Sequence, residues 1–288
     1  MNARLAKLGV VVVVGMLAGA CGSGDGDSGN LDLPPRGSNN ATDDDSIDAE
    51  DTTEETPEAT GDSDGDGIPD DQDCDPQNAE IAGTRLFDEV LTADAQKFSV
   101  ADGFPAASWT YAEEAYRQVR LADASDVTFF AADREIDAVD VEVRAASTEF
   151  SNAITPIVRQ MFVLVGATMN GGSLSAYGCG IEVLGSGASA QRTTAVVKLE
   201  GPADNVVTTA IQRTPRTAVQ ANEDFSLRAQ VTDGKITCTT AQAGDAITTA
   251  EGTGLTIPKG AIGFFTRQTK AAWKSAKICK LKASSNPN

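Results

Sequence analysis

The sequence contains no histidine, and only 5% of its 288 residues are aromatic. Without histidine the chain has no imidazole general base, no Ser-His or Cys-His nucleophile pair and no histidine-containing zinc site. Basic residues are also scarce, with 23 Lys and Arg against 42 Asp and Glu and a net charge of −19. Nucleic-acid phosphates would repel such a chain, so no nucleic-acid partner is expected.

The negative charge is concentrated in one stretch of the chain. Residues 22–82 hold 20 of the 42 acidic residues and only one basic residue, Arg36. Residues 83–288 carry 22 acidic and 20 basic residues and are nearly neutral. Because residues 22–61 have almost nothing apolar to bury, we expect a disordered acidic stalk there. Residues 83–288 are long enough for one folded domain.

The N-terminus has the features of an export signal. Arg4 and Lys7 precede an apolar run, residues 8–17, which is too short to span a bilayer comfortably and ends in small residues. The segment Leu-Ala-Gly-Ala-Cys at 17–21 resembles a bacterial lipoprotein lipobox. The resemblance implies that residues 1–21 form a lipoprotein signal with its lipobox and that Cys21 is lipidated, which anchors an exported protein to a membrane, at the outer membrane or cell surface. The alternative is an ordinary cleaved signal and a released protein.

Residues 62–73 have the spacing of a twelve-residue calcium loop. Aspartates occupy loop positions 1, 3, 5, 9 and 12, and a glycine occupies position 6. A hard cation takes six to eight oxygen ligands, and the glycine allows the sharp turn that brings them together. The predicted cofactor is therefore Ca²⁺, and its predicted ligands are Asp62, Asp64, Asp66, the carbonyl of Ile68, Asp70 and Asp73.

The flanks of this loop decide between loop families. Pro76, shortly after Cys74, blocks the exiting helix that an EF-hand requires. The succession of Asp73 and Cys74 resembles a thrombospondin type-3 repeat, an Asp-rich calcium loop followed closely by cysteine. This resemblance implies a calcium-ordered hinge over residues 62–82; the alternative is further acidic linker.

From residue 83 onward the dominant hydrophobic period is two, which indicates strands. Residues 139–143 alternate valine with acidic residues, and residues 225–231 alternate similarly before the turn Asp233-Gly234. The pattern predicts an antiparallel sandwich. Further strands are expected at 127–131, 162–167, 175–184, 194–200, 261–266 and 276–281, and helices at 111–119 and 152–161.

The domain resembles the concanavalin A-like (LamG-type) jelly roll. The resemblance rests on Leu-Phe-Asp-Glu at 86–89, the hairpin at 225–236 and the closing residues 260–265 followed by Trp273. It implies a mostly β, antiparallel jelly-roll sandwich with a surface for glycan or matrix, or a plain scaffold. Sugar binding usually needs an exposed aromatic platform, but Trp109, Trp273 and Tyr177 are expected in the core.

A glycosidase of the same fold is the alternative function. Glu135, Asp137 and Asp140 resemble the Glu-x-Asp-x-x-Glu strand motif of such enzymes except at the last residue. A retaining glycosidase needs two carboxyl groups about 5–5.5 Å apart. In a regular strand Asp140 would point away from the other two, so the chemistry requires a bulge. We therefore expect no enzyme, with hydrolysis by Glu135 and Asp137 as the alternative.

Four cysteines remain beside Cys21, and export favours disulfides. Cys179 and Cys238 lie on the apolar phase of their strands, so we expect them to pair across the sandwich interior. Cys74 then pairs with Cys279 and clamps the calcium loop onto the domain; the alternative is buried free thiols. Together these features predict a lipid-anchored envelope protein that binds glycan or matrix, or a structural envelope lipoprotein with no ligand.

Overall fold

The computed structural model describes residues 61–93, 97–121, 123–130, 135–151, 156–216, 221–242 and 246–282. The predicted signal, the lipidation residue Cys21 and all but the last residue of the predicted acidic stalk lie outside the described residues. The calcium loop and the domain that follows it are described.

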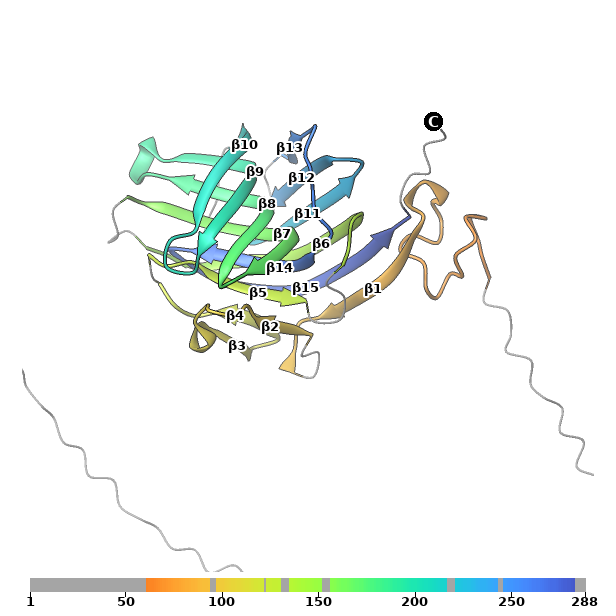
Figure 1. Ribbon diagram of the computed structural model, residues 1–288, viewed down its shortest axis with the longest axis horizontal. Coiled ribbons are helices and arrows are strands. Elements are labelled where there is room, and N and C mark those ends of the chain that lie inside the picture. Colours follow the sequence, from red (N-terminus) through yellow and green to blue (C-terminus); the bar gives the residue numbers. More distant parts are fainter. Residues whose placement is uncertain are drawn as a thin grey trace, which may run out of the picture. The chain divides into compact units, whose positions relative to one another are not determined.

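The described chain folds into two sheets that pack face to face (Figure 1). All strand pairs in this part of the chain are antiparallel. The predicted fold class, a mostly β antiparallel sandwich, is therefore confirmed. The remaining regular structure in the described residues is short 3-10 turns at η1 (Ala79–Ile81), η3 (Ala106–Ser108) and η4 (Gly187–Ser189).

Sheet A has the strand order β13-β12-β11-β6-β15-β4-β3, and β1 also pairs with β15. Sheet B has the order β10-β9-β8-β7-β14-β5-β2. The strands of sheet A are β1 (Gly83–Val90), β3 (Trp109–Ala112), β4 (Ala115–Gln118), β6 (Val139–Phe150), β11 (Asp224–Thr232), β12 (Lys235–Gln242), β13 (Thr248–Gly252) and β15 (Thr269–Leu281). The strands of sheet B are β2 (Phe98–Val100), β5 (Asp126–Phe130), β7 (Val158–Asn170), β8 (Ser173–Leu184), β9 (Gln191–Pro202), β10 (Val207–Pro215) and β14 (Ala261–Arg267).

The main core lies between the two sheets. Alternate residues of β6, such as Val141, are buried in one cluster with alternate residues of β7, such as Val163, because successive strand side chains point to opposite faces. Phe264 stacks on Trp273 with ring centroids 4.2 Å apart and on Phe98 with centroids 4.5 Å apart. Full burial of one such side chain stabilises the fold by roughly 1.5–3 kcal/mol.

Sheet B is buried on both faces. Phe162 and Leu164 point away from the main core and form a second cluster with Phe265, Leu199 and Val206. All five side chains are buried. The central strands of sheet B therefore contain long apolar runs, such as residues 161–167 of β7, as expected for a strand covered on both sides.

The two predicted helices are wrong where the structure describes them. Residues 109–118 form the hairpin β3–β4, whose two-residue turn places Glu113 and Glu114 at φ 50° and 54°. Turns of this hand match the twist of paired strands. Residues 152–155 lie outside the described residues, and residues 158–161 begin β7. In both places pairing within a sheet overrides a weak helical pattern.

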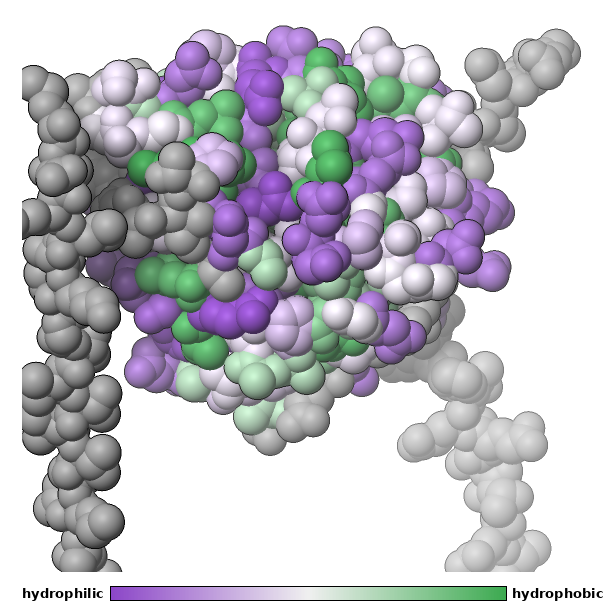
Figure 2. Space-filling model, turned by 60° about the vertical axis from the view of Figure 1, so that its left-hand side comes forward, coloured by the Kyte–Doolittle hydropathy of each residue, from purple (hydrophilic) through white to green (hydrophobic). Residues whose placement is uncertain are grey.

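The described surface is mixed in character. Figure 2 shows hydrophilic and hydrophobic residues interspersed over the face in view. The large exposed apolar side chains among the described residues come from separate segments of the chain, at Val90, Val119, Val207 and Ile247. No helix in the described ranges has the length and apolar character needed to cross a bilayer.

Candidate metal centre and binding clefts

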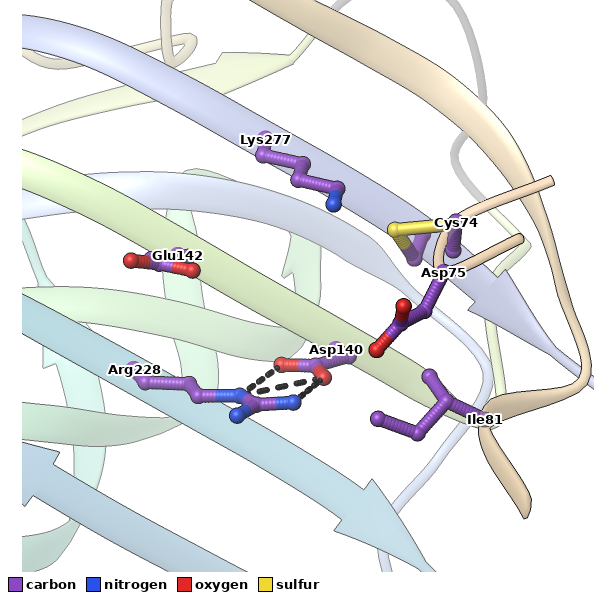
Figure 3. Close-up of a pocket in the computed structure, with 8 residues that line it drawn as sticks. Cys74, Asp75, Ile81, Asp140, Glu142, Arg228 and Lys277 are labelled. Atoms are coloured by element: carbon purple, nitrogen blue, oxygen red, sulfur yellow. Dashed lines mark hydrogen bonds and ion pairs between the residues drawn. A yellow bond between two sulfur atoms is a disulfide. The ribbon is translucent and has the colours of Figure 1, made fainter. Parts of the chain in front are cut away.

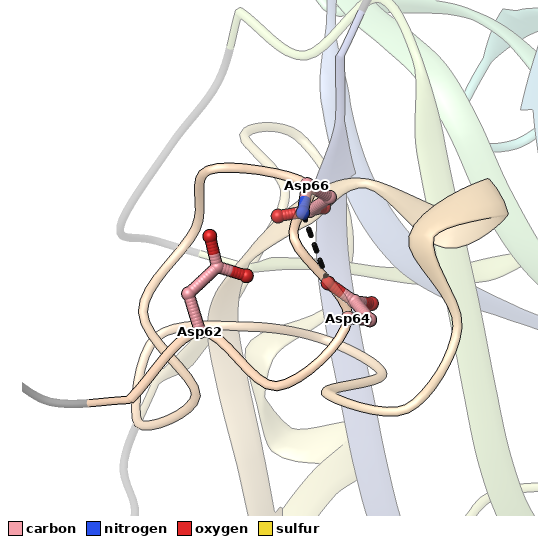
Figure 4. Close-up of side chains that lie close together, drawn as sticks. All are labelled: Asp62, Asp64 and Asp66. Carbon is pink, nitrogen blue, oxygen red and sulfur yellow. Dashed lines mark hydrogen bonds between the residues drawn. The ribbon is translucent and has the colours of Figure 1, made fainter.

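The first half of the predicted calcium loop is a coil held by its own aspartates (Figure 4). The Asp62 carboxylate accepts hydrogen bonds from the amides of Gly65 at 2.9 Å and Gly67 at 3.0 Å. The Asp66 amide donates to Asp64 Oδ1 at 3.1 Å. Gly65 and Gly67 have φ of 78° and 86°, which other residues adopt only with strain. The alternation of aspartate and glycine therefore builds the turn that gathers the carboxylates.

Three aspartates converge within this coil. Asp62, Asp64 and Asp66 each offer a carboxylate oxygen, and these oxygens lie within 4.8 Å of one another. Among the described residues, Oδ2 of Asp64 and Oδ2 of Asp66 are buried without a hydrogen-bond partner. Oxygen donors at this spacing fit a hard cation such as Ca²⁺.

Asp73, the last predicted ligand, is fully buried. Its Oδ1 accepts a hydrogen bond from the amide of Asp75 at 3.1 Å, and its Oδ2 has no partner in the described part of the chain. Burying a carboxylate without a compensating cation is unfavourable. Asp73 and Asp70 are not among the carboxylates that lie within 4.8 Å of one another, so of the predicted ligands the structure gathers Asp62, Asp64 and Asp66.

Asp70 and Ile68 have other contacts in the structure. The Asp70 carboxylate accepts hydrogen bonds from Ser63, from the amide at 2.8 Å and the hydroxyl at 2.7 Å. The side-chain hydrogen bond from Ser63, followed by the backbone one, lowers the pKa of Asp70. The Asp70 amide also donates to the carbonyl of Gly61 at 2.8 Å, so Asp70 ties the two ends of the loop together. The Ile68 side chain is buried, and its amide donates to Asp66.

The loop is docked on the edge of sheet A. Arg85 on β1 donates from Nε and Nη2 to the Asp73 carbonyl, at 3.1 and 2.5 Å. Asp73 also forms an isolated bridge with Thr84. Cys74 is disulfide-bonded to Cys279 on β15, the strand that pairs with β1. The second disulfide joins Cys179 and Cys238 across the main core, so both pairs are those expected from the sequence.

A small groove lies between the end of the loop and the outer face of sheet A (Figure 3). It has a volume of about 110 Å³. Asp75 points across it toward Asp140, which is held by Arg228 at 2.9 and 3.1 Å from Nε and by Gln230 at 3.2 Å. The hydrogen bond to Asp140 raises the pKa of Arg228. The groove therefore has a fixed ion pair on its floor and free space for a few atoms only.

The glycosidase candidates are not gathered into one site. Glu135 and Asp137 precede β6, whereas Asp140 lies in its regular part, which pairs with both neighbouring strands from Val139 onward. Asp137 pairs with Lys259 at 3.2 Å, and hydrogen bonding from Lys259 lowers the pKa of Asp137. Asp137 and Asp140 line different cavities.

A larger polar cleft opens on the face of sheet B that is turned away from sheet A. It has a volume of about 220 Å³, and polar side chains from separate segments line it. Arg267 donates to Ser125 Oγ at 2.8 Å, and Gln268 donates to Asp123 Oδ1 at 2.8 Å. Burial lowers the pKa of Arg267, although the nearby Asp123 opposes the shift. Asp204 and Asn205 complete the rim.

Local sequence patterns gave no indication of this cleft. Its polar residues come from the segments 123–125, 204–205 and 267–268, which are far apart in the chain. In the same region a buried carboxylate, Glu182, accepts hydrogen bonds from Gln160 at 2.8 Å and Arg213 at 2.5 Å. Gln160 in β7 and Glu182 in β8 are buried polar residues in mostly apolar strands. These two polar positions are the one sequence signal that indicates a polar site on this face of sheet B.

The aromatic residues behave as core residues, as predicted. Trp273 is fully buried, and Trp109 and Tyr177 are 8% exposed. Tyr116 stacks on Trp109 and Tyr111 with ring centroids 5.0 and 4.4 Å apart. These side chains therefore stabilise the sandwich and do not form a flat exposed platform.

No protein-family model matches the sequence, and no curated protein sequence matches it. Several solved lectin structures are similar in shape. The Ca²⁺/Man3GlcNAc-bound exoplasmic/lumenal domain of VIP36 has a TM-score of 0.44 and 9% identity, covering 70% of this chain and 93% of its own. Peanut lectin with a 9mer peptide has a TM-score of 0.44 and 10% identity, covering 70% and 99%. The legume lectin-like domain from Entamoeba histolytica has a TM-score of 0.41 and 10% identity, covering 65% and 91%. A likeness of this degree identifies no ligand and no metal.

Proposed function

We propose that residues 62–73 bind one Ca²⁺ ion, which fixes the junction between the N-terminal segment and the sandwich. The observation that carries the proposal is the convergence of Asp62, Asp64 and Asp66, whose carboxylate oxygens lie within 4.8 Å of one another. Asp73, the predicted last ligand, lies outside this group and is fully buried, with its Oδ2 unpartnered in the described residues. Asp62, Asp64 and Asp66 supply the oxygens beside which an ion would sit. Calcium supplies the positive charge that offsets the repulsion among these neighbouring carboxylates.

Titration calorimetry with CaCl₂ on the protein and on two matched variants tests this proposal. Asp73→Asn removes the buried negative charge, and we expect it to weaken calcium binding at least ~10-fold. Asp71→Asn is the control, because Asp71 is an exposed residue of the same loop with no predicted ligand role. Absence of heat with the unmodified protein, or equal affinities for both variants, would reject the calcium site.

We further propose that the protein is exported and anchored by a lipid on Cys21, with the sandwich as its head. The support is the lipobox-like segment at 17–21, which follows a basic and apolar leader. Two signals are needed for a stable membrane anchor, and a diacylated cysteine supplies two chains. Mass spectrometry of the N-terminal peptide from membrane fractions should find acyl groups on Cys21. An unmodified Cys21, or a soluble mature product, would contradict the anchor.

The head is proposed to bind a glycan in the cleft on sheet B. Carboxylate, amide and guanidinium groups converge there at Asp123, Asn205, Arg267 and Gln268, and such planar polar groups hydrogen-bond sugar hydroxyls well. A glycan array should show binding that Asn205→Ala abolishes, while Thr237→Ala on β12 of sheet A leaves it intact. If no glycan binds, the structural envelope lipoprotein becomes the better description.

A further inference from the structure

Lys282 directly follows β15 and reaches the calcium loop. Its backbone is fixed, because the Lys282 amide donates to the carbonyl of Ala82 at 2.9 Å and the preceding Leu281 amide donates to Ala138 at 3.0 Å. Its side chain is exposed, and Nζ donates to the main-chain oxygen of Asp66 at 2.7 Å. A cationic group just after the last strand therefore contacts the main chain of Asp66, one of the three gathered aspartates.

We propose that the Lys282 ammonium is a built-in counter-charge of this loop, which stabilises its ion-free form and weakens its affinity for calcium. The inference rests on the calcium site proposed above and identifies a residue that sets the calcium affinity of that site. Asp66 is the residue that both the Lys282 ammonium and a bound Ca²⁺ ion would contact. Lys282 bonds the Asp66 carbonyl, and the buried Oδ2 of Asp66, which has no partner in the described chain, is available to the metal. The bound ammonium and a bound Ca²⁺ would both be attracted by Asp62, Asp64 and Asp66, and they would repel each other.

The other contacts that hold the loop act at its opposite end. Arg85 donates to the carbonyl oxygens of Asp73 and Asp70, and the disulfide joins Cys74 to Cys279. These contacts position the backbone near the last predicted ligand. Lys282 differs because it bonds the main-chain oxygen of Asp66, one of the three aspartates whose carboxylate oxygens lie within 4.8 Å of one another.

The effect of this charge has a predictable size and salt dependence. A unit charge a few ångströms from a divalent ion in a largely solvated setting changes its affinity by roughly 3- to 10-fold. The effect should shrink at 1 M salt, where the screening length falls to about 3 Å. Removal of the charge should also lower the melting temperature of the metal-free protein, because the clustered carboxylates then repel one another without compensation.

Three variants separate charge from simple packing. Lys282→Gln removes the charge, and Lys282→Arg keeps it. Lys270→Gln is the control for loss of a lysine charge elsewhere on β15, because Lys270 lies at the other end of the strand and pairs with Glu149 at 2.7 Å. Calcium affinity is measured by calorimetry at low and high salt, and the metal-free melting temperature by circular dichroism. We expect Lys282→Gln to bind Ca²⁺ ~3- to 10-fold more tightly at low salt and to melt at a lower temperature without metal. Lys282→Arg should resemble the unmodified protein.

Unchanged or weaker calcium binding by Lys282→Gln would overturn the proposal and leave Lys282 as a plain tether. That result is distinct from failure of the calcium site itself, in which the unmodified protein gives no calcium heat at all. The latter outcome rejects both proposals, whereas heat in the unmodified protein with no gain in Lys282→Gln rejects only this one.

Discussion

Arg85 donates hydrogen bonds to the main-chain oxygen of Asp73, from Nε at 3.1 Å and from Nη2 at 2.5 Å. The buried carboxylate of Asp73 accepts its hydrogen bond from the Asp75 amide instead. An arginine next to a carboxylate usually forms an ion pair with it. Here the guanidinium fixes the backbone of the loop against β1, so that the carboxylate is held in place with Oδ2 unpaired among the described residues.

Arg85→Ala should therefore loosen the loop and weaken its calcium binding. Hydrogen bonds from a charged donor contribute about 1.5–3 kcal/mol, which corresponds to roughly a 10- to 100-fold loss if the loop is ordered only on binding. Calorimetry with CaCl₂ measures the change. Arg117→Ala is the matched control, because Arg117 pairs with the exposed Glu113 far from the loop in sequence. Equal affinity in the two variants would show that Arg85 does not position the loop.

The two disulfides should have separable roles. Cys179 and Cys238 are 59 residues apart and join the sheets through the core. Replacing both with alanine should lower the free energy of unfolding by about 4 kcal/mol, because the unfolded chain is then less constrained. Replacing Cys74 and Cys279 should also weaken calcium binding, since Cys74 directly follows Asp73. Urea denaturation and calorimetry on both double variants test this, and equal calcium affinities would contradict the assignment.

Tyr116 should make the fold sensitive to alkali. Burial raises the pKa of its hydroxyl to about 12, more than the hydrogen bond to Thr128 lowers it. A folded-state pKa above the unfolded value means that the neutral form is favoured in the fold. The corresponding stability is fully present below about pH 10 and is lost as pH rises toward 12. Tyr116→Phe has no such hydroxyl. Rapid urea unfolding between pH 9 and 12 should therefore show that the free energy of unfolding falls less with rising pH in Tyr116→Phe than in the unmodified protein. Parallel declines would show that Tyr116 does not titrate with unfolding.

Much of the fold could be predicted from period-two patterning. The hairpin of β11 and β12 is signalled by strict alternation and by Asp233-Gly234, and its observed register pairs Thr232 with Lys235 across that turn. The β3–β4 hairpin was missed because its turn residues, Glu113 and Glu114, are not typical of turns that need positive φ. Their conformation depends on the pairing of the flanking strands, which no local pattern reveals.

The candidate sites differ in how far local sequence could predict them. The calcium loop is contiguous, so spacing alone suggested its ligands, yet Asp70 turns to Ser63 because that hydrogen-bonding partner becomes available only in the folded coil. The sheet B cleft unites Ser125, Asn205 and Arg267 from distant segments. Such convergence follows from strand order and sheet curvature, neither of which is encoded in the spacing of a few residues.

The environment of Asp140 predicts a structural role for this carboxylate and no hydrolysis. Its side chain is 9% exposed and is engaged by Arg228 and Gln230, so it is poorly placed to act as an acid or a nucleophile. Asp140→Asn should lower the free energy of unfolding by about 2 kcal/mol, because Arg228 loses its charged partner and an NH2 donor replaces one of the two acceptor oxygens that face Arg228 and Gln230. Glu135→Gln should lower stability less than Asp140→Asn does, because Glu135 is exposed.

Reducing-sugar assays on polysaccharides should detect no hydrolysis by the unmodified protein. The carboxyl pair of a retaining glycosidase must face one sugar ring, whereas Asp137 is paired with Lys259 and lines a different cavity from Asp140. Denaturation by urea measures the stability changes in the same preparations. Hydrolysis that disappears in Glu135→Gln but persists in Asp140→Asn would instead establish an enzyme built on Glu135 and Asp137, with Asp140 serving the fold alone.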